Sequence, residues 1–93
     1  MVVGKLLLVL TVPGARSLKT KRRAVRSIKD RVRGRYNVSI AEVDAQDYWQ
    51  TAMLAVCAVG TDRAYVEGLL DQVLNLIRQR RDVVLGRSEK EFI

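Results

Sequence analysis

Residue types that build common functional sites are scarce in this chain. Its 93 residues include one cysteine and no histidine. An intrachain disulfide and a zinc site made of Cys and His are therefore excluded, and we expect no metal and no cofactor. The missing disulfide fits a reducing compartment, so a cytoplasmic protein is expected, with Cys57 as a small core residue. No apolar run approaches the roughly 20 residues that cross a bilayer, and no membrane partner is predicted.

Aromatic residues are also few, at 5% of the chain. Their scarcity matters because the RNA-recognition motif stacks bases on aromatic residues of its two central strands. Of the two segments that we predict as central strands, 2–12 has no aromatic residue and 49–59 has only Trp49, at its end. Base stacking on the sheet is therefore not expected. An apolar outer sheet face predicts contact with another subunit instead.

Basic residues are abundant and unevenly placed. The chain has 17 Lys and Arg against 10 Asp and Glu, a net charge of +7. Residues 1–35 hold eleven basic residues and one acidic residue, a net +10, whereas residues 36–93 hold six and nine, a net −3. A concentrated positive charge attracts polyanions such as nucleic acid. The first third of the chain is therefore the expected polyanion site.

The hydrophobic pattern predicts a single domain over residues 1–93 with the element order βαββαβ. Strand-like runs of Val, Leu and Ile occur at 2–12, 36–43, 49–59 and 83–93. One helix starts after Ser17 as N-cap and is closed by Gly34, and the other follows Asp62. Right-handed crossovers make this order a ferredoxin-like α+β sandwich, a four-stranded antiparallel sheet with two helices on one face. The first and third strands are expected in its centre.

The first predicted helix concentrates its basic residues on one side. At about 100° per residue they fall within a sector about 120° wide. The residues of this sector, which only Asp30 interrupts, are Lys19, Arg22, Arg23, Arg26, Lys29 and Arg33. A solvated helix face usually mixes signs, whereas here like charges repel. We therefore prefer phosphate binding to the alternative of a plain solvated face, and we expect Arg80 and Arg81, after the second helix, to lie apart from this cluster.

Residues around the start of the first helix complete the candidate site. Arg16 and Ser17 precede its first free backbone N–H groups, where the helix dipole favours a bound phosphate. Lys21 lies on the apolar side of the helix, where a side chain that extends outward is the simpler interpretation and a ligand contact the alternative. The candidate nucleic-acid-binding residues are Arg16, Ser17, Lys19, Lys21, Arg22, Arg23, Arg26, Lys29 and Arg33.

Three carboxylates, Glu42, Asp44 and Asp47, lie in or beside the predicted turn between the second and third strands. Paired carboxylates can act as acid and base or can hold Mg²⁺. Aspartate is also a common turn residue, and no nucleophile and base pair accompanies these three. We therefore predict no catalytic residue and no metal site.

Two motifs, Ser-Leu-Lys-x-Lys-Arg at 17–22 and Asn-Val-Ser-x-Ala-Glu-Val at 37–43, together with 47–50, closely resemble the YlxP-like family, also called DUF503. The resemblance extends over essentially the whole chain. It implies a ferredoxin-like fold and a bacterial cytoplasmic protein, often encoded beside translation and ribosome-maturation factors. The family's polar residues fall on Ser17, Lys19, Lys21, Arg22, Asn37, Ser39, Glu42, Asp47, Trp49 and Gln50. The family commonly has His where this chain has Ala45, which weakens any metal or acid/base site in the turn.

The sequence therefore predicts a binding module rather than an enzyme, with RNA or a ribosomal particle as partner and a homodimer formed through the outer sheet face. The first alternative is a structural or regulatory homo-oligomer whose basic helix binds an acidic protein. A second alternative is an acylphosphatase-like enzyme of the same fold, which needs an Arg and Asn pair that Arg16 and Asn37 loosely resemble. Fold alone cannot establish that activity.

Overall fold

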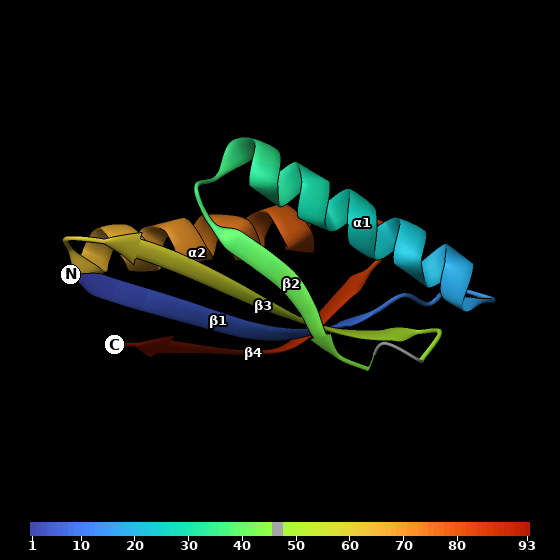
Figure 1. Ribbon diagram of the computed structural model, residues 1–93. Helices are drawn as coiled ribbons and strands as arrows, with labels where there is room; N and C mark the ends of the chain where they lie inside the picture. The colour runs from blue at the N-terminus through green and yellow to red at the C-terminus, as the bar shows by residue number, and fades with distance from the viewer. Residues whose placement is uncertain (46–47) are drawn as a thin grey trace.

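The computed structural model, which describes residues 1–45 and 48–93, has the predicted element order (Figure 1). The elements are β1 (Val2–Thr11), α1 (Leu18–Arg35), β2 (Ser39–Asp44), β3 (Thr51–Gly60), α2 (Arg63–Arg78) and β4 (Val84–Phe92). The four strands form one antiparallel sheet in the order β2-β3-β1-β4. The ferredoxin-like fold and the central positions of the first and third strands are confirmed.

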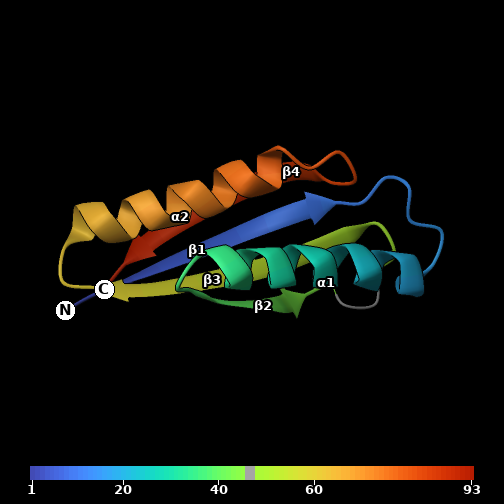
Figure 2. The same ribbon diagram turned by 90° about the horizontal axis from the view of Figure 1, so that it is seen from above.

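Both helices cover the same face of the sheet (Figure 2). On β1, Leu6, Leu8 and Leu10 are buried beneath them, and the intervening residues point to the open face. The buried stripe of α1 includes Val25 and Ile28. Every second residue of a strand and every third or fourth residue of a helix points to the same side. The core-facing residues of all six elements therefore meet in one layer between the sheet and the helices.

The predicted N-caps are confirmed, and the predicted C-cap is wrong. The side chain of Ser17 accepts a hydrogen bond from the Thr20 backbone N–H at 3.3 Å. The Asp62 carboxylate accepts one from the Tyr65 backbone N–H at 3.2 Å. Helix α1 continues through Gly34, which has no positive φ, and ends one residue later. Gly34 therefore supplies no left-handed turn, and the extended backbone of the next residue ends the helix instead.

The connection between β2 and β3 also differs from the prediction. Strand β3 begins at Thr51, two residues later than expected, so Trp49 lies before the strand and not in it. Asp47, which was predicted to flank the turn, lies outside the described residues. Ala45 has a φ of 60°, and its backbone N–H donates to the Asp44 carboxylate at 2.7 Å.

The two edge strands are both irregular. The pairing of β4 with β1 shifts register between Leu8 and Leu10, and the pairing of β2 with β3 shifts between Glu42 and Asp44. A register shift of this kind marks a β-bulge, which bends the strand and adds local twist.

The open face of the sheet, opposite the helices, is largely apolar. Leu7 is 39% exposed, and Val43 and Val59 are about half exposed. Cys57 lies on this face opposite Lys5 and is only half-buried, so its prediction as a core residue is wrong. No helix is long and apolar enough to cross a membrane in the described part of the chain.

Candidate nucleic-acid interface

Five basic residues of α1 form one solvent-facing surface, here called the basic face: Lys19, Arg22, Arg23, Arg26 and Lys29. All are exposed except Lys29, which is half-buried. None of them forms an ion pair with a carboxylate in residues 1–45 and 48–93. A hollow of about 500 Å³ is lined by Lys19, Arg22, Arg23 and Arg26. The helix therefore presents a group of unneutralised cations around a surface depression.

A second hollow continues the basic face toward strand β2. It has a volume of about 380 Å³ and is lined by Arg22, Arg26 and Lys29 together with Val25 and Glu42. Glu42, the carboxylate that lines this hollow, is held by Lys21 at 2.9 Å. The cations of the hollow thus remain available for an anionic ligand.

Lys21 does not extend outward, so that prediction is wrong. Its side chain is fully buried. Its Nζ donates hydrogen bonds to Glu42 Oε2 at 2.9 Å and to the backbone carbonyls of Ala45 at 2.8 Å and Thr51 at 3.1 Å. A buried ammonium requires such partners because desolvation of an unpaired charge is costly. Lys21 is therefore not available to contact phosphate and instead joins α1 to the β2–β3 connection.

Arg33, Arg16 and Ser17 differ in how free they are to meet a ligand. One amino group of Arg33, Nη2, donates to the Ile40 carbonyl at 2.8 Å and so holds α1 against β2. The Ser17 hydroxyl is engaged with Thr20, both as the helix cap and through the Thr20 hydroxyl at 3.2 Å. Arg16 is exposed at the start of the helix. Arg16 is therefore the most available of the three to contact a ligand.

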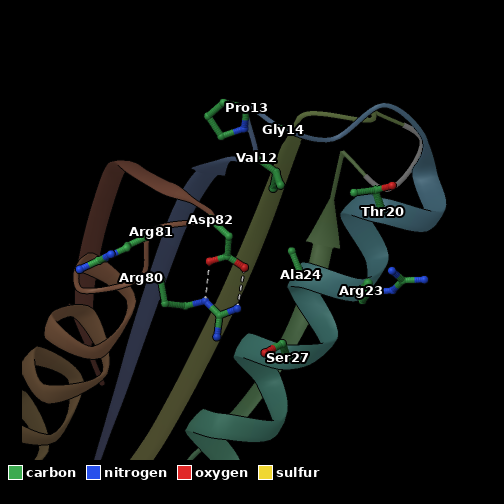
Figure 3. A pocket seen from close by; sticks show the side chains of 10 residues that line it. All are labelled: Val12, Pro13, Gly14, Thr20, Arg23, Ala24, Ser27, Arg80, Arg81 and Asp82. Carbon is green, nitrogen blue, oxygen red and sulfur yellow. Dashed lines mark hydrogen bonds and ion pairs between the residues drawn. The ribbon is translucent and has the colours of Figure 1, made fainter.

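A cleft separates the first half of α1 from the loop between α2 and β4 (Figure 3). Its volume is about 510 Å³, and Arg80 and Asp82 lie on one side of it with Ala24 and Ser27 of α1 on the other. Arg23 and Arg81 also line the cleft, but their guanidinium groups point away from it on opposite sides. Arg80 and Arg81 therefore share a cleft with Arg23 but lie on its far side, so they remain apart from the first-helix cluster. Thr20 and Ser27 add hydroxyl groups on the α1 side.

One carboxylate, Asp82, also lines this cleft. Arg80 holds it through two hydrogen bonds, Nε to Oδ1 at 2.9 Å and Nη2 to Oδ2 at 2.7 Å. This two-pronged contact lowers the pKa of Asp82 below its ordinary value of 3.8. Asp82 therefore neutralises Arg80 and leaves Arg23 and Arg81 as the cations without a carboxylate partner in the described part of the cleft.

Sequence comparison identifies the family. Residues 3–89 match the profile of the family described as "Protein of unknown function (DUF503)". The chain belongs to this family. "Uncharacterized protein YlxP" of Bacillus subtilis (strain 168) is 41% identical to it over 63 residues, which is 68% of either chain. Among solved structures, "De novo designed protein Foldit4" superposes with a TM-score of 0.56 at 14% identity, over 100% of this chain and 97% of that one. That likeness concerns the fold alone.

Two features of this DUF503 protein were missed from sequence. The burial of Lys21 had a signal, because Lys21 falls on the same side of the helix as Val25, Ile28 and Val32. The place of the loop after α2 had none, because nothing in the spacing of Arg80 and Arg81 relates them to Arg23, more than fifty residues earlier. Only the fold brings that loop to the cleft that Arg23 also lines.

Proposed function

We propose that this DUF503 protein is a non-enzymatic module that binds RNA, free or in a ribosomal particle, by contacts between phosphates and the basic face of α1. The observation that carries the proposal is the set of five cations on one helix face without an ion pair in the described residues. Like charges three or four residues apart on a helix repel one another. This repulsion lowers the stability of the free protein, and a bound anion relieves it. A phosphate backbone supplies a row of such anions, and its binding releases counterions.

The cleft between α1 and the α2–β4 loop extends this surface. Arg23 belongs both to the basic face and to the cleft, and Arg81 lies on the opposite wall. A phosphate chain that follows α1 would therefore have cations on a second element to one side. Guanidinium groups suit this role because their donors form paired hydrogen bonds to phosphate oxygens.

The decisive experiment reverses charge at two sites. In Arg22→Glu/Arg26→Glu, two favourable contacts become repulsive, so affinity for RNA should fall at least tenfold while folding changes little at these exposed sites. The matched control is Arg63→Glu/Arg87→Glu, which makes the same change in net charge away from the basic face. Arg63 lies over the Phe92 ring at 4.4 Å, so circular dichroism must confirm that the control is folded. Equal loss of binding in both variants would contradict the proposal.

The alternative partner is an acidic protein, which the same cations would also attract. The two partners differ in their response to ribonuclease. Copurification of RNA that is lost on ribonuclease treatment, together with direct binding of purified RNA, supports the RNA proposal. A complex that survives the treatment, combined with absence of binding to purified RNA, supports the protein partner.

We also propose that the open sheet face packs against a second copy of this chain. Beside its apolar centre this face carries an ion pair, Lys5 with Glu91 at 3.5 Å. In a dimer with two-fold symmetry, Lys5 of each copy can pair with Glu91 of the other, which favours self-association. Light scattering at high micromolar concentration should give twice the 10.5 kDa of one chain. Leu7→Glu places a charge in the centre of this face and should restore the monomer. A monomeric wild-type protein would rule this dimer out.

Absence of catalysis is part of the proposal, and the placement of Arg16 and Asn37 supports it. Arg16 precedes α1 and Asn37 follows it, and the helix has 18 residues. At 1.5 Å per residue the two ends are about 27 Å apart, too far to hold one phosphate group. The pair required by the acylphosphatase alternative is therefore not assembled within one chain. Hydrolysis of acyl phosphate that disappears in Arg16→Ala would contradict this part of the proposal.

A further inference from the structure

Two aromatic side chains project from the connection between β2 and β3. Tyr48 is 65% exposed and Trp49 is 56% exposed. The whole chain has only five aromatic residues, one of them Trp. Of the others, Tyr36 and Phe92 pack partly against the core, whereas Tyr65 is exposed on α2. Adjacent exposed aromatic residues are typical of contact surfaces because they offer a large apolar area with few rotatable bonds.

The flanks of this aromatic pair are fastened to the segment that leads into α1. The backbone carbonyl of Gln50 accepts a hydrogen bond from the Val12 N–H at 2.8 Å. The Gln50 side-chain amide donates to the carbonyl of Ala15 at 3.2 Å, and to that of Pro13 at 3.4 Å. Residues 48–50 therefore have a defined place on the molecule and do not form a free loop.

Lys21 anchors the same connection from the helix side. Its ammonium holds the Thr51 carbonyl at 3.1 Å and the Ala45 carbonyl at 2.8 Å, on either side of the aromatic pair. Both ribbon views place the start of β3, directly after residues 48–50, at the end of the molecule where α1 begins (Figures 1 and 2). The aromatic pair therefore lies at the same end as Arg16 and Lys19, where the basic face starts.

We infer that Tyr48 and Trp49 stack on unpaired bases of an RNA whose phosphates are held by the basic face, so that the ligand is single-stranded RNA and not a duplex. The inference rests on the proposed function. It follows from the chemistry of the two surfaces. Cations bind the phosphate backbone of single-stranded and duplex RNA alike, whereas aromatic rings stack only on bases that are not paired within a duplex. Every base has a ring face, so this recognition needs little sequence preference.

Trp49 provides its own probe because it is the only tryptophan of the chain. Intrinsic fluorescence should be quenched when a single-stranded RNA of about 10 nucleotides binds, since site sizes of this order are common. An RNA duplex of similar length and heparin, a polyanion without bases, should bind with little change in emission. Quenching of equal size by heparin would overturn the inference, because it would report charge and not stacking.

Substitution separates stacking from charge. Trp49→Ala should lower affinity for the single strand by about 5- to 150-fold, the range measured for removal of a base-stacking ring, and leave affinity for the duplex unchanged. Trp49→Phe keeps a ring and should retain most of the single-strand affinity. The matched control is Tyr65→Ala, which removes an exposed ring at the far end of the molecule and should change neither affinity. Circular dichroism checks that each variant is folded.

The outcomes distinguish this inference from the function on which it rests. Suppose that Arg22→Glu/Arg26→Glu abolishes RNA binding, and that Trp49→Ala binds both the single strand and the duplex as tightly as wild type does. The proposal of RNA binding then stands, and base stacking is refuted. If wild type binds neither RNA form, both proposals fail together. If Trp49→Ala and Trp49→Phe lose single-strand affinity equally, the ring itself is not what the RNA contacts, and the inference is wrong.

Discussion

The buried Lys21 gives the sharpest test of the structure itself. Its ammonium is completely enclosed and holds a carboxylate, that of Glu42, and two backbone carbonyls, those of Ala45 and Thr51. In Lys21→Met, a side chain of similar shape fills the same space without the charge or the hydrogen-bond donors. The substitution therefore leaves three acceptors without this partner and creates little cavity.

The expected cost follows from two estimates of the same interaction. Removal of one partner from a buried ion pair costs about 3–5 kcal/mol. A buried acceptor left unsatisfied costs about 1–3 kcal/mol. Because the Ala45 carbonyl still accepts from the Tyr48 backbone N–H at 3.1 Å, loss of the Lys21 hydrogen bonds gives a cost of the same order. The two estimates overlap and are not summed, so Lys21→Met should lose about 3–5 kcal/mol of unfolding free energy. In a domain of this size, that corresponds to a fall in Tm of roughly 12 to 40 °C.

Thermal and urea unfolding, followed by circular dichroism, measure this loss. The matched control is Lys19→Met, the same exchange at an exposed position of α1, which should change stability by less than about 0.5 kcal/mol. In Lys21→Met/Glu42→Leu, the carboxylate that Lys21 held is also gone, so part of the stability should return. If Lys21→Met lost less than about 1 kcal/mol of unfolding free energy, no more than the control, the ammonium would not be buried and would not hold the β2–β3 connection.

Three further predictions address binding, packing and pH. If four to six phosphates contact the basic face and its neighbours, log K for RNA should fall against log salt with a slope of roughly −3 to −5; a slope near zero would contradict ion pairing. Gly4→Ala places a Cβ 2.5 Å from Val66 Cγ1 and 3.0 Å from Leu70 Cδ1, so thermal unfolding should show a loss of about 1–3 kcal/mol, and an unchanged Tm would contradict this contact. Because Arg80 lowers the pKa of Asp82 below 3.8, the contribution of this pair to stability is present above pH 3.8 and is lost as pH falls through the folded pKa. An NMR titration that places the Asp82 pKa at or above 3.8 would contradict the pairing.

The fold was predictable because local signals and long-range packing agree. Alternating residues such as Leu6, Leu8 and Leu10 mark one face of a strand, and Ser17 and Asp62 offer oxygen atoms where helices need caps. The right-handed crossover rule then leaves few arrangements of six elements. The ends of the strands were harder to predict, because a strand ends where its backbone pairing with the neighbouring strand ends, and that depends on the neighbour.

The candidate site was predictable only where it lies on a single element. The basic face depends on positions along one helix, so its residues follow from the helical repeat. The contacts of Lys21 join residues 21 to 30 positions apart, and the cleft joins Arg23 to a loop that follows α2. Contacts between residues this far apart in the chain depend on how the helices and loops are placed over the sheet, which residue spacing alone does not predict. Trp49 was predicted to begin a strand, whereas β3 starts at Thr51 and leaves the Trp49 side chain exposed before it.

The bulges on the two edge pairings have a consequence for how copies of this chain can assemble. Addition of a further strand requires a straight edge with evenly spaced N–H and C=O groups, and a bulge interrupts that spacing. Here β2 is bulged after Glu42, and β4 has a register shift opposite the Leu8–Leu10 segment of β1 and carries several charged residues. Neither edge offers a uniform template, so growth into a continuous intermolecular sheet or fibre is disfavoured. The proposed dimer would then use the broad face of the sheet, where a contact between two such faces closes on itself after two copies.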